Sequence, residues 1–130
     1  MTATVERVPV GRLRHIEGFS KKRVDWLVEK ILAEGVWTKP VALDAEHDLV
    51  LDGQHRMETA KRLGLKWVPA IRYVYADVEV WSLRPAHQFD WQTVTERALA
   101  DKPYPYKTVK HRFPEGGLPE IAIPLAELRQ

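Results

Sequence analysis

The sequence contains no cysteine. This absence excludes disulfide bonds, thiolate nucleophiles and cysteine-ligated metal sites. A strong charge of either sign is absent too, because 20 Lys and Arg residues stand against 18 Asp and Glu residues and leave a formal net charge of +2. So small an excess does not predict bulk binding to nucleic acid, although it is compatible with a local basic patch.

Long apolar runs are also missing. The stretch "MTATVERVPVGRL" lacks the apolar segment of a signal peptide, and no window approaches the roughly 18 apolar residues of a membrane-spanning helix. No low-complexity segment is present, and 45% hydrophobic with 29% charged residues is an ordinary globular balance. We therefore expect one soluble, cytoplasmic domain over residues 1–130.

The spacing of apolar residues predicts a small α+β domain with a mixed sheet and flanking helices. A first helix is expected between the N-cap Ser20 and the stop signal Gly35. Its apolar face is expected to consist of Val24, Leu27, Val28, Ile31 and Leu32. Further helices are expected at about 54–63 and 91–100, and strands within 5–13, 40–43, 49–52, 67–75 and 78–83. The proline-rich stretch over 101–117 cannot form a long regular element, and 121–128 is expected to be a strand with a short helical turn.

The segment "LVLDGQHRMETAKRLG" (49–64) places a histidine and an arginine where a helix starts. An apolar strand ends at Asp52, Gly53 permits a tight turn, and the helix begins directly after it. Unpaired backbone N–H groups and the macrodipole make this end of a helix positive, so His55 and Arg56 are unfavourable there unless an anion binds. With a bound phosphate they become additional donors, and the segment therefore indicates an anion site.

A solvated surface turn explains the same residues, with Arg56 paired to a carboxylate such as Asp52 or Glu58. The short local pattern leaves these two interpretations equally open. For Asp52, an ordinary Asp-Gly turn is the more common explanation. A carboxylate beside a phosphate site is nevertheless suited to binding Mg²⁺ or to accepting a proton from a nucleophile.

From residue 5 to about 75 the sequence resembles the ParB/sulfiredoxin superfamily. The shared layout consists of "VPVGRL", a helix with "LVEKILAEGVWTKPVAL", and "LVLDGQHRMETAKRLGLKWVPAI". The resemblance implies a small α/β domain that binds nucleotide phosphates at the turn before the second helix. Sulfiredoxins carry a cysteine where this chain has Gln54, so their reaction is excluded. ParB proteins carry an arginine-rich turn and a following helix-turn-helix domain, which residues 76–130 do not resemble.

Within this superfamily the sequence is most similar to the free-serine kinases, which phosphorylate the hydroxyl of free L-serine with ATP or ADP and Mg²⁺. Their turn usually reads Asp-Gly-His-His-Arg, where this chain reads "DGQHR". Their early loop glutamate, the tryptophan past their third strand and their Lys-Thr/Ser-x-Arg-His segment match Glu17, Trp81 and "KTVKH" (107–111). Gln54 and Lys110 depart from that pattern, and the chain is shorter than kinases of this branch typically are.

The resemblance implies a role for each matched residue. Gly53, Gln54, His55, Arg56 and Lys107 would bind the nucleotide, Trp81, Thr108, Lys110 and His111 would bind the substrate, and Asp52 would hold Mg²⁺. Glu17 would be the base that takes the proton from the acceptor hydroxyl, with Asp52 and His55 assisting catalysis. Residues 5–75 would form the superfamily core, and 76–130 an extension that completes the substrate pocket.

These residues also have structural interpretations. Glu17 could be a solvated loop carboxylate, residues 107–111 an exposed basic loop, and Trp81 a packing residue. The remaining tryptophans, Trp26, Trp37, Trp67 and Trp91, are expected to be structural, and His15, His47 and His87 to lie on the surface or in loops. The alternative functions are a non-catalytic ParB-type nucleotide- or DNA-binding module and a ParB-like nuclease. Neither a membrane nor nucleic acid is expected as a partner, and the sequence does not indicate an oligomeric state.

Overall fold

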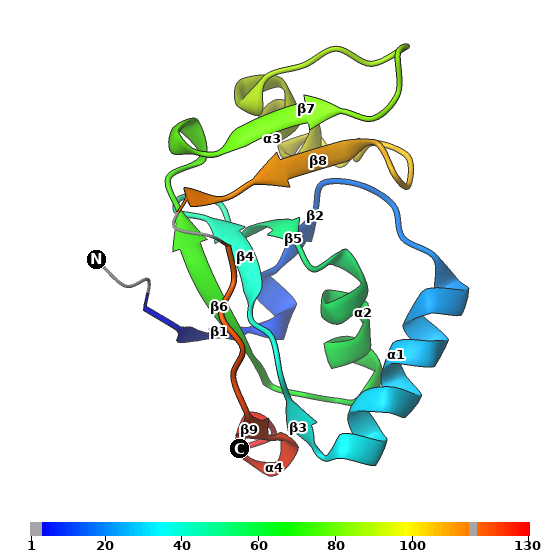
Figure 1. Ribbon diagram of the computed structural model, residues 1–130, viewed down its shortest axis with the longest axis vertical. Helices are drawn as coiled ribbons and strands as arrows, with labels where there is room; N and C mark the ends of the chain where they lie inside the picture. The colour runs from blue at the N-terminus through cyan, green and yellow to red at the C-terminus, as the bar shows by residue number, and fades with distance from the viewer. Residues whose placement is uncertain (1–3, 115–116) are drawn as a thin grey trace.

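A five-stranded mixed sheet forms the centre of the protein, a computed structural model of which describes residues 4–114 and 117–130 (Figure 1). Its strands are β1 (Glu6–Pro9), β2 (Arg14–His15), β4 (Val41–Asp44), β5 (Leu49–Asp52) and β6 (Trp67–Tyr73). They lie in the order β1-β6-β4-β5-β2, and both parallel and antiparallel neighbours occur. The expected α+β class is confirmed, and the proline-interrupted first strand lies at an edge, where its missing N–H is tolerated.

Strands β4 and β5 are apolar up to the aspartate that ends each of them, because both faces of the sheet are covered. On β4, Val41 and Leu43 belong to the core below the helices, whereas Ala42 between them belongs to a second core on the opposite face. On β5, Val50 faces the first core and Leu51 the second. Sheet periodicity therefore divides one short apolar run between two separate cores.

Two helices, α1 (Lys21–Glu34) and α2 (Gln54–Arg62), pack side by side against one face of the sheet (Figure 1). The Ser20 hydroxyl accepts a hydrogen bond from the backbone N–H of Arg23, and Gly35 ends α1 with a φ of 72°, as the sequence predicts. The assignment of Leu32 to the apolar face is wrong, because its side chain is 52% exposed. The buried side chains of α1 are therefore only Val24, Leu27 and Ile31.

The second half of the chain contributes to both cores. Strand β7 (Glu79–Ser82) pairs antiparallel with β8 (Val109–Arg112), and helix α3 (Trp91–Leu99) lies beside this ribbon in the upper part of Figure 1. The C-terminal segment returns to the other side, where β9 (Ile123–Pro124) pairs with β3 (Val36–Trp37) and α4 (Leu125–Leu128) closes the first core. Among the described residues no helix is both long and apolar enough to span a bilayer.

The proline-rich stretch over 101–117 contains one short strand, β8 over residues 109–112, and no long regular element is found among its described residues. Val109 is buried, while its neighbour Lys110 is exposed, so the ribbon alternates apolar and charged positions and the cations do not oppose strand formation. Prolines flank this strand without interrupting it. Residues 115 and 116 lie outside the described part of the chain.

The turn between β5 and α2 is closed by Gly53, whose φ is 119°. A Cβ built at this position would lie 2.7 Å from Cγ1 of Val41 on the neighbouring strand β4. Glycine is therefore required here both by its backbone conformation and by the close approach of β4. The turn fixes where α2 starts relative to the sheet.

Replacing Gly53 with Ala is expected to lower the free energy of unfolding by about 1–3 kcal/mol. Two costs contribute, because the backbone conformation is strained for alanine and its Cβ would overlap with Val41. Gly64→Ala is the matched control, because Gly64 has a φ of 66° but open space around its Cβ position. That variant should lose only roughly 1 kcal/mol from its backbone conformation. Denaturant unfolding compares the two, and equal losses would show that the contact with Val41 is unimportant.

Candidate active site

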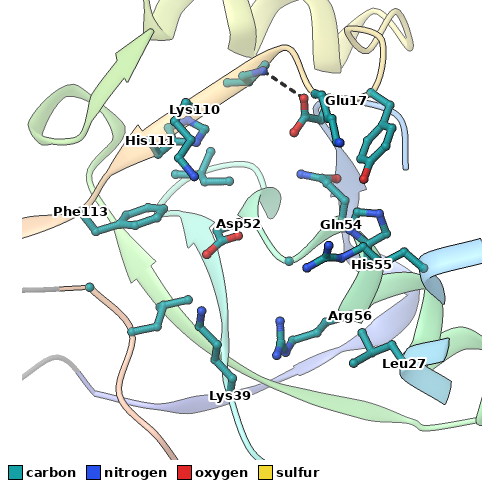
Figure 2. Close-up of a pocket in the computed structure, with 18 of the residues that line it drawn as sticks. Glu17, Leu27, Lys39, Asp52, Gln54, His55, Arg56, Lys110, His111 and Phe113 are labelled. Carbon is teal, nitrogen blue, oxygen red and sulfur yellow. Dashed lines mark hydrogen bonds between the residues drawn. The ribbon is translucent and has the colours of Figure 1, made fainter. Parts of the chain in front are cut away.

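A cavity of about 700 Å³ lies between the start of α2, helix α1 and the β7–β8 ribbon. Figure 2 shows Glu17, Lys110 and His111 at one end, Lys39 at the other, and Asp52 between them. Nine of the eleven residues singled out in the sequence line this cavity: Glu17, Asp52, Gly53, Gln54, His55, Arg56, Lys107, Lys110 and His111. Segments far apart in the sequence therefore meet at the helix start.

The lining is strongly cationic although the whole chain is nearly neutral. Two carboxylates, Glu17 and Asp52, face six Lys and Arg residues: Arg23, Lys30, Lys39, Arg56, Lys107 and Lys110. Within residues 4–114 and 117–130, only Lys30 among these six has an ion-pair partner, Glu34. A cavity lined by unpaired cations concentrates a positive potential and is suited to a multiply charged anion.

Arg56 combines charge with burial beside the helix start. Burial lowers the pKa of its guanidinium, the Asp52 carboxylate raises it, and Arg23 lowers it further. An arginine nevertheless stays charged in proteins. In the part of the chain that the structure describes, its side chain makes no hydrogen bond or ion pair, so its donors remain available to a ligand beside the first N–H groups of α2.

His55 is neutral, and the expectation of a cationic histidine at the helix start is therefore wrong. Its Nε2 accepts a hydrogen bond of 3.0 Å from the backbone N–H of Ser20, which requires that nitrogen to be unprotonated. Burial lowers the pKa of His55, and the charges of Arg23, His15 and Arg56 lower it further. The proton of the ring lies on Nδ1, so His55 can donate one hydrogen bond without opposing the helix dipole.

Glu17 projects from the loop between β2 and α1 to the other end of the cavity. Its Oε2 accepts hydrogen bonds of 3.0 Å from the backbone N–H groups of Thr108 and Val109. Burial raises the pKa of this carboxyl and outweighs those two bonds, and the nearby Asp52 charge acts in the same direction as burial. The second oxygen, Oε1, has no partner among the described residues, so Glu17 is held in place and can still accept a proton.

Two residues expected to contact the substrate have other partners in this structure. The Thr108 side chain is fully buried, and its hydroxyl donates to the carbonyl of Pro105 at 2.6 Å. The Nε2 of His111 lies 2.8 Å from the Tyr75 hydroxyl, and its ring also bonds the backbone of Leu51. Burial lowers the pKa of His111 to about 4, so this ring is a neutral support for the cavity wall and not a cationic donor.

Trp81 does not reach the main cavity. It lines a separate hollow of about 390 Å³ together with residues 80, 82–85 and 87–89, and Trp81 is 41% exposed. Its position on β7 is opposite Lys110 of β8. The match of Trp81 to the family pattern therefore does not place it beside the helix start.

Several lining residues were missed by the sequence reasoning, among them Arg23, Lys39, Tyr106 and Phe113. Trp26, expected to be structural, is 58% exposed and lies at the cavity beside Lys30. The residues of α1 could have been predicted to act together, because positions 23, 26, 27 and 30 are spaced so that they lie on one face of the helix. Lys39 and Phe113 lie in connecting segments and carry no such signal.

His15 is also placed differently from the expectation of a surface residue. Its ring is partly buried between α2 and Phe19, and both ring nitrogens have hydrogen-bond partners on α2. His47 pairs with Asp44 at the β4–β5 turn, and His87 packs against Tyr104. No group of three or more His, Asp or Glu side chains suited to a metal ion occurs in residues 4–114 and 117–130.

No protein-family model matches the sequence. Two curated proteins are similar to it: an ADP-dependent L-serine kinase of Thermococcus kodakarensis, 27% identical over 96 residues, and an ATP-dependent L-serine kinase of Staphylothermus marinus, 38% identical over 77 residues. The first alignment covers 69% of this chain and 40% of the relative, and the second covers 56% and 31%. The chain therefore spans less than half the length of the curated relatives it matches.

The fold is that of a free serine kinase solved in complex with AMP. The two structures superpose with a TM-score of 0.86 at 14% identity, over 98% of this chain and 95% of the other. The resemblance to free-serine kinases drawn from the sequence is thereby confirmed, since the similar curated proteins are L-serine kinases and the similar fold is that of a free serine kinase.

Replacing Glu17 with Gln is expected to stabilise the protein at neutral pH, because the pKa of this carboxyl is raised in the folded state. The folded protein then binds the proton more tightly than the unfolded chain does, so stability is lost as the pH rises through the folded-state pKa. A glutamine at position 17 keeps an oxygen that accepts the two backbone hydrogen bonds, and it causes no such loss of stability with rising pH because it does not ionise. Thermal unfolding at a series of pH values should show a gain that grows with pH and disappears in acid.

Glu58→Gln is the matched substitution, for which the opposite change in stability is expected. Burial disfavours ionisation of Glu58, but hydrogen bonds from His15 and Lys61 outweigh it and lower the pKa of the carboxyl. Its contribution to stability is therefore present above the unfolded-state pKa and lost as the pH falls. The variant should be less stable than the parent at neutral pH, and a change of the same sign in both variants would refute this electrostatic description.

Proposed function

We propose that this chain, with the fold of the free serine kinases, is a nucleotide-dependent kinase that phosphorylates the hydroxyl of free L-serine or a similar small hydroxy amino acid. The observation that carries the proposal is the convergence of a partly buried carboxylate, Glu17, and the start of helix α2, Gly53–Arg56, on one cationic cavity. Its curated relatives, named as ADP- and ATP-dependent L-serine kinases, support the same reaction.

The nucleotide phosphates are proposed to bind at the start of α2. The unpaired N–H groups of its first turn, the Nδ1–H of His55 and the guanidinium of Arg56 supply hydrogen bonds to phosphate oxygens. Lys107 also lines the cavity and can reach an anionic group there. Either ADP or ATP is compatible with this arrangement, and both donors remain in the proposal.

Asp52 is the residue that would hold Mg²⁺. Its carboxylate is exposed to the cavity, has no hydrogen-bond partner among the described residues, and follows the strand directly before the helix start. These features fit Mg²⁺, which takes one or two protein carboxylates and completes its shell with phosphate oxygens and water. When bound, the ion would neutralise negative charge on the transferring phosphoryl group.

Glu17 is proposed as the general base. As the serine oxygen attacks the terminal phosphorus, the bond from that phosphorus to the nucleotide oxygen breaks, and the hydroxyl proton passes to Oε1 of Glu17. Two backbone N–H groups hold the other carboxylate oxygen, so the accepting oxygen has a fixed direction. The raised pKa of Glu17 makes it a stronger base than a solvated glutamate.

Lys110 is proposed to bind the carboxylate of the acceptor amino acid. It lies on β8 beside Val109, whose N–H holds Glu17, and its ammonium group has no ion-pair partner in the described part of the chain. Thr108 and His111 contribute indirectly, by holding Glu17 and the cavity wall. Residues 76–130 thus supply one wall of the proposed substrate site, whereas 121–128 pack into the first core.

Glu17→Gln is expected to lower kcat by about 100-fold or more, because the hydroxyl loses its proton acceptor. The affinity for nucleotide should change by less than about threefold, since the helix start is untouched. Phosphoserine formation and calorimetric titration with ADP and ATP in the presence of Mg²⁺ measure both effects, with Glu46→Gln on the exposed β4–β5 turn as the control. Phosphoryl transfer at the parental rate would exclude Glu17 as the base, and nucleotide binding without turnover on any hydroxy amino acid would overturn the proposed reaction.

Arg56→Gln is expected to weaken nucleotide binding by about 10- to 100-fold, as for loss of a charged hydrogen-bond donor. Arg62→Gln changes an arginine in the last turn of the same helix, where it pairs with Asp25, and should leave the affinity nearly unchanged. Titrations at two salt concentrations test this comparison. Equal losses in the two variants, or tight binding to DNA in place of nucleotide, would favour a non-specific cationic surface instead.

A further inference from the structure

The loop that carries Glu17 is attached to α2 at both of its ends. At its start, the ring of His15 reaches the first turns of α2, where Nδ1 contacts Oε1 of Gln54 and Nε2 lies 2.7 Å from Oε2 of Glu58. At its end, the N–H of Ser20 donates to Nε2 of His55 on the same helix. The proposed base is therefore connected to the proposed phosphate site by side chains on either side of it.

The partners of His15 determine its protonation state. The Nε2 of Gln54 donates to the backbone carbonyl of Val50, so it is the amide oxygen that faces His15. The other partner, Glu58, is a carboxylate, which accepts hydrogen bonds only. Both ring nitrogens of His15 therefore donate, and the ring is an imidazolium cation. The charged groups that face it are Glu58 and Lys61 on α2, and the neutral ring of His55 is close by.

We infer that His15 is a positioning residue, which as a doubly protonated ring fixes the Glu17 carboxylate relative to the phosphate-binding start of α2. The inference rests on the proposed function, because it assigns Glu17 the part of the base. His15 stacks on Phe19 within the same loop, with ring centroids 5.1 Å apart, so its two hydrogen bonds hold the loop as well as the ring. His15 does not line the cavity and does not touch the reacting groups.

Gln54 has a defined part in this arrangement. Its side chain is buried, and it joins strand β5 to His15 by donating to the carbonyl of Val50 and accepting from the ring. An amide can do both at once because it carries a donor and an acceptor on one planar group. The contact is thus suited to a charged His15, which needs an acceptor on each side.

The test replaces His15 with Gln, which removes the charge and one of the two aligned donors. Turnover of the full chain with serine, Mg²⁺ and ADP or ATP should fall about tenfold or more, since a small misplacement of a catalytic group is costly, while the dissociation constant for nucleotide changes less than about threefold. His47→Gln is the matched control, because it removes another histidine–carboxylate contact, with Asp44, outside the cavity. A purely structural role would lower the melting temperature of the variant but leave kcat unchanged.

Two NMR measurements test the inference independently of turnover. Nitrogen-15 spectra of the His15 ring should show both nitrogens protonated at neutral pH, and a neutral ring would overturn the inference. The carbon-13 signal of the Glu17 carboxyl should report a pKa above the ordinary range in the parent, and a pKa closer to the ordinary range in the His15→Gln variant, as the loop opens to water. An unchanged titration, or an unchanged kcat, would also overturn it.

The two proposals fail in distinguishable ways. Absence of phosphoryl transfer by the parent with every hydroxy amino acid tested would reject the proposed reaction, and the NMR titration of Glu17 would still decide whether His15 positions the loop. If His15→Gln does not fold, Glu58→Gln replaces it, because that variant keeps the ring but removes one acceptor. It should lower kcat by a smaller factor, and a parental kcat would overturn the inference.

Discussion

The turn between β5 and α2 can close only because Gly53 has no side chain to meet Val41 on the adjacent strand. That approach sets the direction in which α2 leaves the sheet and thereby aims its unpaired N–H groups into the cavity. Asp52 before the turn and Arg56 after it take their positions from the same geometry. The positions of the charged residues around the start of α2 therefore depend on the close approach of Gly53 to the Val41 side chain.

The protonation states of the histidines around the cavity are set by burial and by their hydrogen-bond partners. Three histidines lie near its wall, and each is held in a state that its partners require: His55 accepts from an N–H, His111 takes part in bonds to Tyr75 and Leu51, and His15 donates to two acceptors. The first two are neutral and the third is charged. The positive potential facing a ligand therefore comes from Lys and Arg, while the histidines organise the backbone around it.

Much of the fold could be predicted because its signals are local. The cap at Ser20, the stop at Gly35 and the short apolar runs of β4 and β5 are read directly from neighbouring residues. The neutral state of His55 could not be predicted, because it depends on the backbone N–H of Ser20, which lies 35 positions away in the sequence. The strand β8 could not be predicted from neighbouring residues, because it is stabilised by pairing with β7. The two strands are separated in the sequence by helix α3. The presence of glutamine at position 54, where the free-serine kinase pattern has histidine, can be explained only from the structure, which places His15 beside it.

The pairing of β9 with β3 has a bearing on how the protein is made. Trp37 and Leu128 are completely buried in one core, yet they come from early and late parts of the chain. During synthesis the N-terminal part emerges with Trp37 uncovered, and its core is completed only when the segment around α4 follows. Such contacts between distant segments slow folding, because a long loop must close before they form. The core under α1 and α2 is therefore completed only when the segment around α4 has joined it.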